Sequence, residues 1–352
     1  VFHCEDPVHS EVRGAMGFGA PTYVAANGAV LTRGFGGLAT VVEVSPAEGD
    51  TSWKLPPVPL PNPARRFRML LRPNVGSTPT LPIYGIALTE AGQESPPPDS
   101  GQRVGPTLVL NRNEPVSVWV VNNLPEATAI TWHGIEGESI NDGFPGVSGV
   151  KPTPLPRNAP PPKEPPKPPY APLIAPGDSF EVRLAPPRSG TFAYHAVVSE
   201  TRQWAAGIVG AVVVTDRNKY DAALNLPLLI SSPSDSVMES HAVLINGSTT
   251  PPEVDVKRGA AFRIRAMNFA VGRPDLVLEM RHQDSTFAAW RLVARDGIEL
   301  PAAERVSLPA RAMISNGQMR DFEFSTTRIG EYRLEVRTVS GTVLGVQPIR
   351  VY

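Results

Sequence analysis

The stretch Val116-Ser-Val-Trp-Val-Val-Asn122 decides the fold class of this chain. β-Branched and aromatic residues fill it, with Pro115 directly before it and Asn123-Leu-Pro125 directly after it. A short run of this kind between turn-forming residues is typical of a β-strand. Similar runs lie on both sides, at Phe67–Leu71, Ile83–Leu88, Phe180–Leu184, Thr191–His195 and Ile208–Val214. About seven short strands separated by turns predict a β-sandwich.

The composition agrees with an all-β chain. Its 352 residues include 40 prolines and 30 glycines, and proline neither donates to a sheet ladder nor fits a helix interior. The formal net charge is −1, from 33 basic and 34 acidic side chains, so we expect no nucleic-acid partner. The longest apolar run, Gly207–Val214, is far shorter than the ~20 residues of a membrane helix. We therefore expect no transmembrane segment.

The chain divides into three blocks. Residues 1–62 end in a Pro-rich linker, residues 63–218 hold the strands named above, and residues 219–352 contain further alternating segments such as Phe262–Arg265. The alternation predicts a second sandwich in the last block. Residues 151–172 are half proline, which favours an extended polyproline II arm. This arm is either a solvated surface excursion or a docking element for another protein.

Six short motifs follow one another in the second block. They are Gly105-Pro-Thr-Leu-Val-Leu110, Thr131-Trp-His-Gly134, Asp142-Gly-Phe-Pro-Gly146, Ile174-Ala-Pro-Gly-Asp-Ser-Phe180, Gly190-Thr-Phe-Ala-Tyr-His195 and Gly207–Val214. In this order and spacing they resemble the first domain of a multicopper oxidase of the laccase-like, cupredoxin type. The third block, with Leu244-Ile-Asn-Gly247 and Val293-Ala-Arg-Asp-Gly297, resembles the second domain of that family. The resemblance implies tandem cupredoxin-like Greek-key β-sandwich domains.

The first block resembles the C-terminal end of a copper-carrying cupredoxin domain. We therefore expect residues 1–62 to be a partial or remnant cupredoxin segment. The resemblance implies that Cys4, His9 and Met16 are what is left of a mononuclear copper site. Its missing histidine would come from upstream of Val1 or from another chain. Alternatively, Cys4 is a small buried hydrophobe without a metal.

The three-copper centre of the family needs eight histidines in four His-X-His pairs, and this sequence has six in total. His133 and His195 are the remnants of two pairs, because Thr131 and Val197 stand where the family has their partners. Glu5 replaces a histidine of a third pair. Threonine and valine do not replace imidazole as copper ligands. We therefore expect a degenerate member in which the two histidines are held by backbone carbonyls or form a weak two-histidine metal site.

These observations favour a non-catalytic protein over an enzyme. We expect a structural or accessory subunit without a cofactor, which binds a protein partner in the periplasm or elsewhere outside the cytoplasm. A membrane-bound electron-transport complex is a candidate host, and residues 151–172 are the candidate docking element. The main alternative is a copper-binding electron-transfer protein or oxidase completed by residues upstream of Val1.

A binder of small molecules or carbohydrates in the old cleft is the third possibility. No cluster of carboxylates or exposed aromatic residues in the sequence argues for it. Trp119, Trp132 and Trp204 are expected to be core or rim aromatic residues.

Overall fold

The computed structural model describes residues 62–94, 103–146, 148–149, 170–217, 219–233, 242–273 and 275–352. Before residue 62 it describes the backbone of four short strands, β1 (Phe2–His3), β2 (Thr22–Val24), β3 (Val30–Thr32) and β4 (Ala39–Thr40). Strand β1 pairs with β4, and β2 pairs with β3. The predicted Pro-rich arm lies outside the described residues except for its last three, and the division at residues 62 and 218 stays a prediction.

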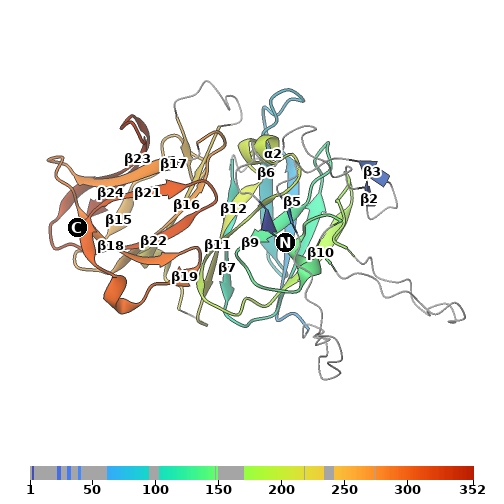
Figure 1. Ribbon diagram of the computed structural model, residues 1–352, viewed down its shortest axis with the longest axis horizontal. Coiled ribbons are helices and arrows are strands. Elements are labelled where there is room, and N and C mark those ends of the chain that lie inside the picture. Colours follow the sequence, from blue (N-terminus) through green and yellow to red (C-terminus); the bar gives the residue numbers. More distant parts are fainter. Residues whose placement is uncertain are drawn as a thin grey trace, which may run out of the picture.

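Two four-stranded sheets form a first sandwich, as the alternating sequence predicts (Figure 1). One sheet has the order β10-β8-β5-β6 and the other has the order β7-β12-β11-β9. The pairs β5–β8 and β7–β12 are parallel. The strands are β5 (Arg65–Pro73), β6 (Tyr84–Glu90), β7 (Gly105–Asn111), β8 (Val116–Asn122), β9 (Ile130–His133), β10 (Ser179–Leu184), β11 (Gly190–Ala196) and β12 (Val209–Thr215).

Two further sheets form a second sandwich. The first has the order β14-β13-β16-β22-β18-β19, with β20 on β18, and the second has the order β15-β24-β23-β17-β21. Their strands are β13 (Asn225–Ser231), β14 (Leu244–Ile245), β15 (Val254–Val256), β16 (Phe262–Phe269), β17 (Asp275–His282), β18 (Ala289–Arg295), β19 (Ile298–Glu299), β20 (Ser307–Pro309), β21 (Arg311–Ser315), β22 (Met319–Phe324), β23 (Gly330–Thr338) and β24 (Val343–Val351).

Helices are short in the described part of the chain. They are α2 (Glu200–Ala206) and the 3₁₀ turns η1 (Ser139–Asp142), η2 (Ala222–Leu224) and η3 (Ala302–Glu304). Among the described residues, no helix has the length and apolar character of a membrane span. The all-β, cupredoxin-like fold class expected from the sequence is confirmed.

Strand β16 packs against a core on each of its two faces. Side chains alternate along a strand, and Phe262 and Ile264 pack in the core of the second sandwich. Met267 and Phe269 point to the other face and belong to the core cluster of the first sandwich. The two sandwiches therefore share an apolar interface, to which β22 adds Met319.

A buried polar contact crosses the same interface. The hydroxyl of Thr191 in β11 donates to Asp321 Oδ2 in β22 at 2.7 Å. Two arginines of β16 also bind this carboxylate, Arg263 Nε at 2.8 Å and Arg265 Nη1 at 3.0 Å. Since an unpaired buried charge is costly, this cluster holds the two sandwiches in one register.

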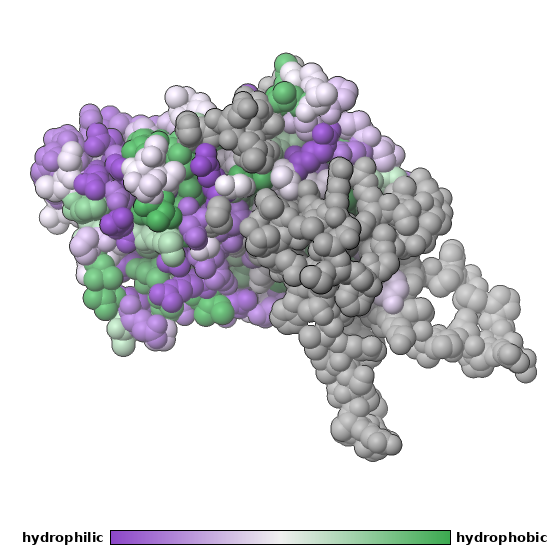
Figure 2. Space-filling model, turned by 45° about the horizontal axis from the view of Figure 1, so that its top comes forward, coloured by the Kyte–Doolittle hydropathy of each residue, from purple (hydrophilic) through white to green (hydrophobic). Residues whose placement is uncertain are grey.

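The outer sheet of the second sandwich has one solvated face, which is common for antiparallel sheets. Ion pairs cover that face, including Arg281 with Glu279 and Arg337 with Glu335. Figure 2 shows polar side chains interspersed with small apolar patches over this part of the molecule. The described surface of the second sandwich therefore has no single dominant apolar region in this view.

Candidate functional site

The structure brings His133 and His195 together, as the resemblance implies. They lie on neighbouring antiparallel strands, β9 and β11, where Ala193 pairs with His133. Side-chain alternation places both imidazoles on one face of the sheet and Trp132 and Tyr194 on the other. The Tyr194 hydroxyl lies inside the first sandwich, and burial raises its pKa well above the ordinary value. The histidine pair therefore faces away from that core, towards the second sandwich.

A backbone carbonyl orients one of the two imidazoles. His195 Nδ1 lies 2.9 Å from the carbonyl oxygen of Ala196, which can only accept a hydrogen bond. Nδ1 therefore carries the hydrogen in neutral His195, and Nε2 is the acceptor. That Nε2 lies 3.4 Å from Nδ1 of His133. The carbonyl contact is the one expected for a histidine held by the backbone.

Aromatic rings enclose the pair. The ring centroid of Phe269, from β16 of the second sandwich, lies 5.3 Å from that of His195 and 5.9 Å from that of His133. The ring centroid of Trp204, from α2, lies 4.7 Å from that of His195. The indole N–H of Trp204 donates to the same Ala196 carbonyl. His195 is fully buried, whereas His133 is half-buried.

Thr131 and Val197, which the resemblance aligns with histidines of the family, have structural contacts. Thr131 Oγ1 donates to Asp142 Oδ1 at 3.1 Å, which ties β9 to the turn of the Asp142–Gly146 motif. Val197 packs in a small apolar cluster with Phe144 and Leu173. Both positions are buried. Each side chain therefore contributes to packing or to loop geometry where an imidazole would otherwise lie.

Copper is the metal that the family implies. Among the described residues, no group of three or more His, Cys, Asp or Glu side chains is arranged to hold a metal ion. A three-copper cluster depends on several imidazoles fixed in concert, so the donor set of the described residues does not fit one. Cys4, His9 and Met16 lie outside the described residues, and a mononuclear copper site there stays a prediction.

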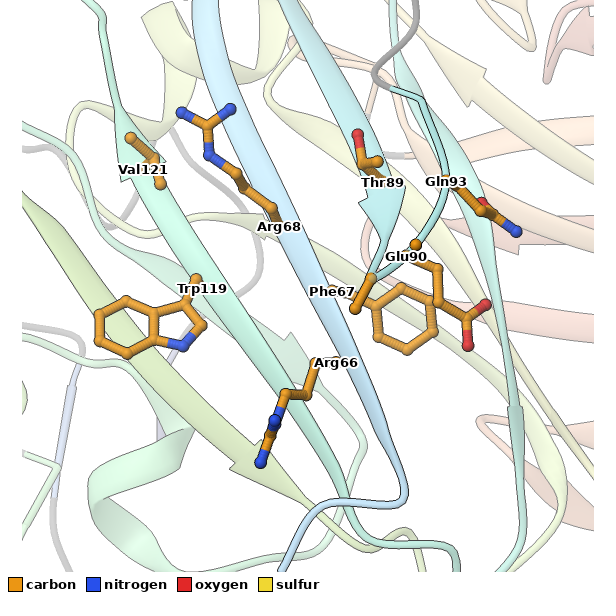
Figure 3. Close-up of a pocket in the computed structure, with 10 residues that line it drawn as sticks. Arg66, Phe67, Arg68, Thr89, Glu90, Gln93, Trp119 and Val121 are labelled. Carbon is orange, nitrogen blue, oxygen red and sulfur yellow. The ribbon is translucent and has the colours of Figure 1, made fainter.

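Sequence reasoning missed a second feature, which involves Trp119. Trp132 and Trp204 are buried, as expected, but Trp119 is 45% exposed. It lines a groove of about 460 Å³ on the outer face of the β10-β8-β5-β6 sheet, together with Arg66 and Arg68 (Figure 3). The signal was available in the sequence. Since Val116, Val118 and Val120 face inward, Trp119 must face outward.

Known proteins resemble this chain in sequence. A multicopper oxidase family model matches residues 100–156 and 169–219. Laccase-1 of Emericella nidulans is 30% identical over 136 residues, which are 39% of this chain and 18% of that protein. Multicopper oxidase mco of Staphylococcus aureus is 25% identical over 231 residues, which are 59% of this chain and 44% of that protein. The chain thus spans less than half the length of these relatives.

Solved structures resemble it in fold. A crystal structure of a multicopper oxidase has a TM-score of 0.59 and 17% identity, covering 82% of this chain and 88% of that one. The blue copper oxidase of Nitrosomonas europaea has a TM-score of 0.56 and 17% identity, covering 81% and 85%. The fold is thus one of cupredoxin-like sandwiches. Residues 100–156 and 169–219 are similar to a domain of the multicopper oxidase family.

Proposed function

We propose that this chain is a non-catalytic multicopper-oxidase-like protein that serves as a structural or accessory subunit and binds a protein partner. One observation carries the proposal. The two remaining histidines are enclosed by Phe269 and Trp204, and the lost ligands are replaced by packed residues, Thr131 and Val197. A scaffold can persist when its site residues are lost, because function depends on residues carried by the fold rather than on the fold itself.

The location and the host belong to the same proposal. A place outside the cytoplasm, such as the periplasm, follows from the usual location of cupredoxin-type domains. A membrane-bound electron-transport complex is the proposed host. The Pro-rich segment 151–172 is one proposed docking element, because polyproline II segments lose little entropy on binding.

The alternative is a copper electron-transfer protein or oxidase completed by residues upstream of Val1. The geometry of the histidine pair supplies an argument for it. His195 Nε2 and His133 Nδ1 are 3.4 Å apart. At this separation both nitrogens can bind one metal ion at about 2.0 Å each. Copper binding at that position would also require further ligands from beyond the described residues.

Metal analysis of the purified chain after copper loading separates the two functions. We expect fewer than three copper ions per chain, no oxidation of phenolic substrates, and no intense absorbance near 600 nm, the band typical of copper–thiolate bonding. A blue band that is lost in Cys4→Ala would overturn the proposal. Three bound copper ions with oxidase activity would do so as well.

The accessory role needs a test of its own. Size-exclusion chromatography of a gently solubilised extract should show the chain in an assembly larger than itself, and the same fraction should lack copper-dependent oxidase activity. A chain recovered only as a free monomer would contradict the role. His195→Ala is a control for the metal analysis. Because the histidine pair is structural in this proposal, the variant should leave the copper content unchanged.

A further inference from the structure

The groove beside Trp119 is lined by the parallel strands β5 and β8 and by the end of β6 with the turn that follows it. In β5, Phe67 and Met69 point into the core, so Arg66 and Arg68 point outward. Arg68 pairs in register with Trp119 of β8. In Figure 3, the guanidinium group of Arg68 lies further along β5 in one direction than the indole of Trp119, and that of Arg66 lies further in the other. The groove thus combines a flat apolar ring with two cations.

Among the described residues that line the groove, the carboxylate of Glu90 is already engaged. It accepts hydrogen bonds from Arg65 Nε at 2.7 Å and Arg65 Nη2 at 2.8 Å. These bonds lower the pKa of Glu90, which stays ionised and satisfied by Arg65. In the described part of the chain, the side chains of Arg66 and Arg68 form no ion pair or hydrogen bond. The groove therefore carries two available guanidinium groups.

A carboxylate of the neighbouring strand β10 is also engaged. Glu181 of β10 pairs in register with Trp119. It accepts a hydrogen bond from Ser117 Oγ at 2.7 Å, and Arg183 Nη2 lies 3.3 Å from its second oxygen. Glu181 therefore leaves the two guanidinium groups of the groove available to an external anion.

The spacing of the two arginines indicates the class of ligand. Residues two apart in a strand are separated by roughly 6.6 Å. In an extended peptide, carboxylates at alternate positions have nearly the same spacing, and guanidinium groups bind carboxylates in a bidentate manner. The exposed indole of Trp119 offers an apolar surface to an adjacent proline or aliphatic side chain.

We propose that this groove binds an extended acidic segment of the partner protein, with carboxylates at alternate positions on Arg66 and Arg68 and an apolar residue on Trp119. The assignment rests on the proposed partner-binding function. The chain's own Pro-rich segment does not suit the groove, because its charged residues are mostly basic: Lys151, Arg157, Lys163 and Lys167 against Glu164.

Calorimetric titration of the full chain with an acetylated peptide of alternating glutamate and threonine tests the assignment. Threonine favours the β conformation, in which glutamates two positions apart point to the same side. We expect saturable binding that weakens with rising salt. Arg66→Gln with Arg68→Gln should lower the affinity by at least about tenfold. Trp119→Ala should lower it by a similar factor, with recovery in Trp119→Phe.

Matched controls separate the groove from general charge. Arg258→Gln with Arg295→Gln removes two exposed arginines of the second sandwich and should leave binding nearly unchanged. A glutamine-for-glutamate peptide should not bind. The assignment is wrong if the control variant loses as much affinity as the groove variant, or if the groove variant binds like the parent.

An anionic polysaccharide is the competing ligand. If oligogalacturonate binds the groove more tightly than the peptide and displaces it, the peptide assignment falls. This test is independent of the metal analysis. Peptide binding in a copper-loaded, active oxidase would overturn the accessory role but support the groove. If the chain is free of copper and the peptide does not bind, the groove assignment is wrong and the accessory role stands.

Discussion

Phe269 and His195 lie with their ring centroids 5.3 Å apart, although one belongs to the second sandwich and the other to the first. This contact places a ring of β16 against the face of the β7-β12-β11-β9 sheet that carries His133 and His195. The neighbouring side chains Met267 and Met319 extend the same apolar interface. The face that carries His195 is therefore packed against β16 and β22, and His195 is part of the interface between the two sandwiches.

Phe269→Ala should destabilise the protein strongly. The ring is fully buried between the sandwiches, and removing a buried phenylalanine costs about 3–5 kcal/mol through lost contacts and the cavity left behind. Urea unfolding followed by tryptophan fluorescence measures the change. Phe287→Ala is the matched control, because that ring is 41% exposed and should contribute much less. Equal effects of the two variants would refute the interface as described.

Asp321→Asn should weaken the junction of the two sandwiches. It removes the charge that pairs with buried Arg265 and one of the two carboxylates that pair with Arg263, and breaking a buried ion pair costs about 3–5 kcal/mol. Glu323→Gln, on the same strand, is the control. Its partner Arg291 is largely exposed, so we expect a loss of at most about 1 kcal/mol. Calorimetry should show a lower unfolding temperature for Asp321→Asn, and a result no larger than the control would contradict this account.

Gly143→Ala should disturb the loop that supports β9. Gly143 has a φ of +80°, and a Cβ atom there would lie 1.9 Å from the backbone oxygen of Ile130. Gly177 has a φ of +86° but no atom within 4 Å of such a Cβ. Gly177→Ala should therefore cost only the left-handed conformation, about 1–2 kcal/mol, and Gly143→Ala clearly more. Equal losses in equilibrium unfolding would show that the loop adapts freely.

Glu90 should make stability depend on pH in the acid range. Its hydrogen bonds to Arg65 lower its pKa in the folded state, so the unfolded state takes up a proton first as the pH falls. The stabilisation is present above the unfolded pKa of about 4.3 and is lost as the pH falls through the lower folded pKa. Glu90→Gln should flatten the unfolding free energy between about pH 5 and pH 3. Arg65→Met should flatten it too, and an unchanged slope in both variants would disprove the coupling.

Much of the site could be predicted from residue identity. The presence of Thr131 and Val197 in place of histidines is visible in the sequence, and so is the pairing of motifs that brings His133 and His195 onto adjacent strands. The enclosure by Phe269 could not be predicted, because Phe269 carries no motif and lies in a different sandwich. For Trp119 the sequence analysis predicts only a core or rim position. The alternation of β8 indicates more, namely that this side chain faces outward.

The sequence by itself determined the all-β class, the order of the motifs and which residues stand at the positions of the family's histidines, because these depend on local alternation and on residue identity. Only the tertiary structure decided that Arg68 lies beside Trp119 and that Phe269 covers His195. The physical reason is that alternation assigns each side chain to a face of its strand, whereas the choice of neighbouring strand and facing sheet depends on pairing and packing between distant segments.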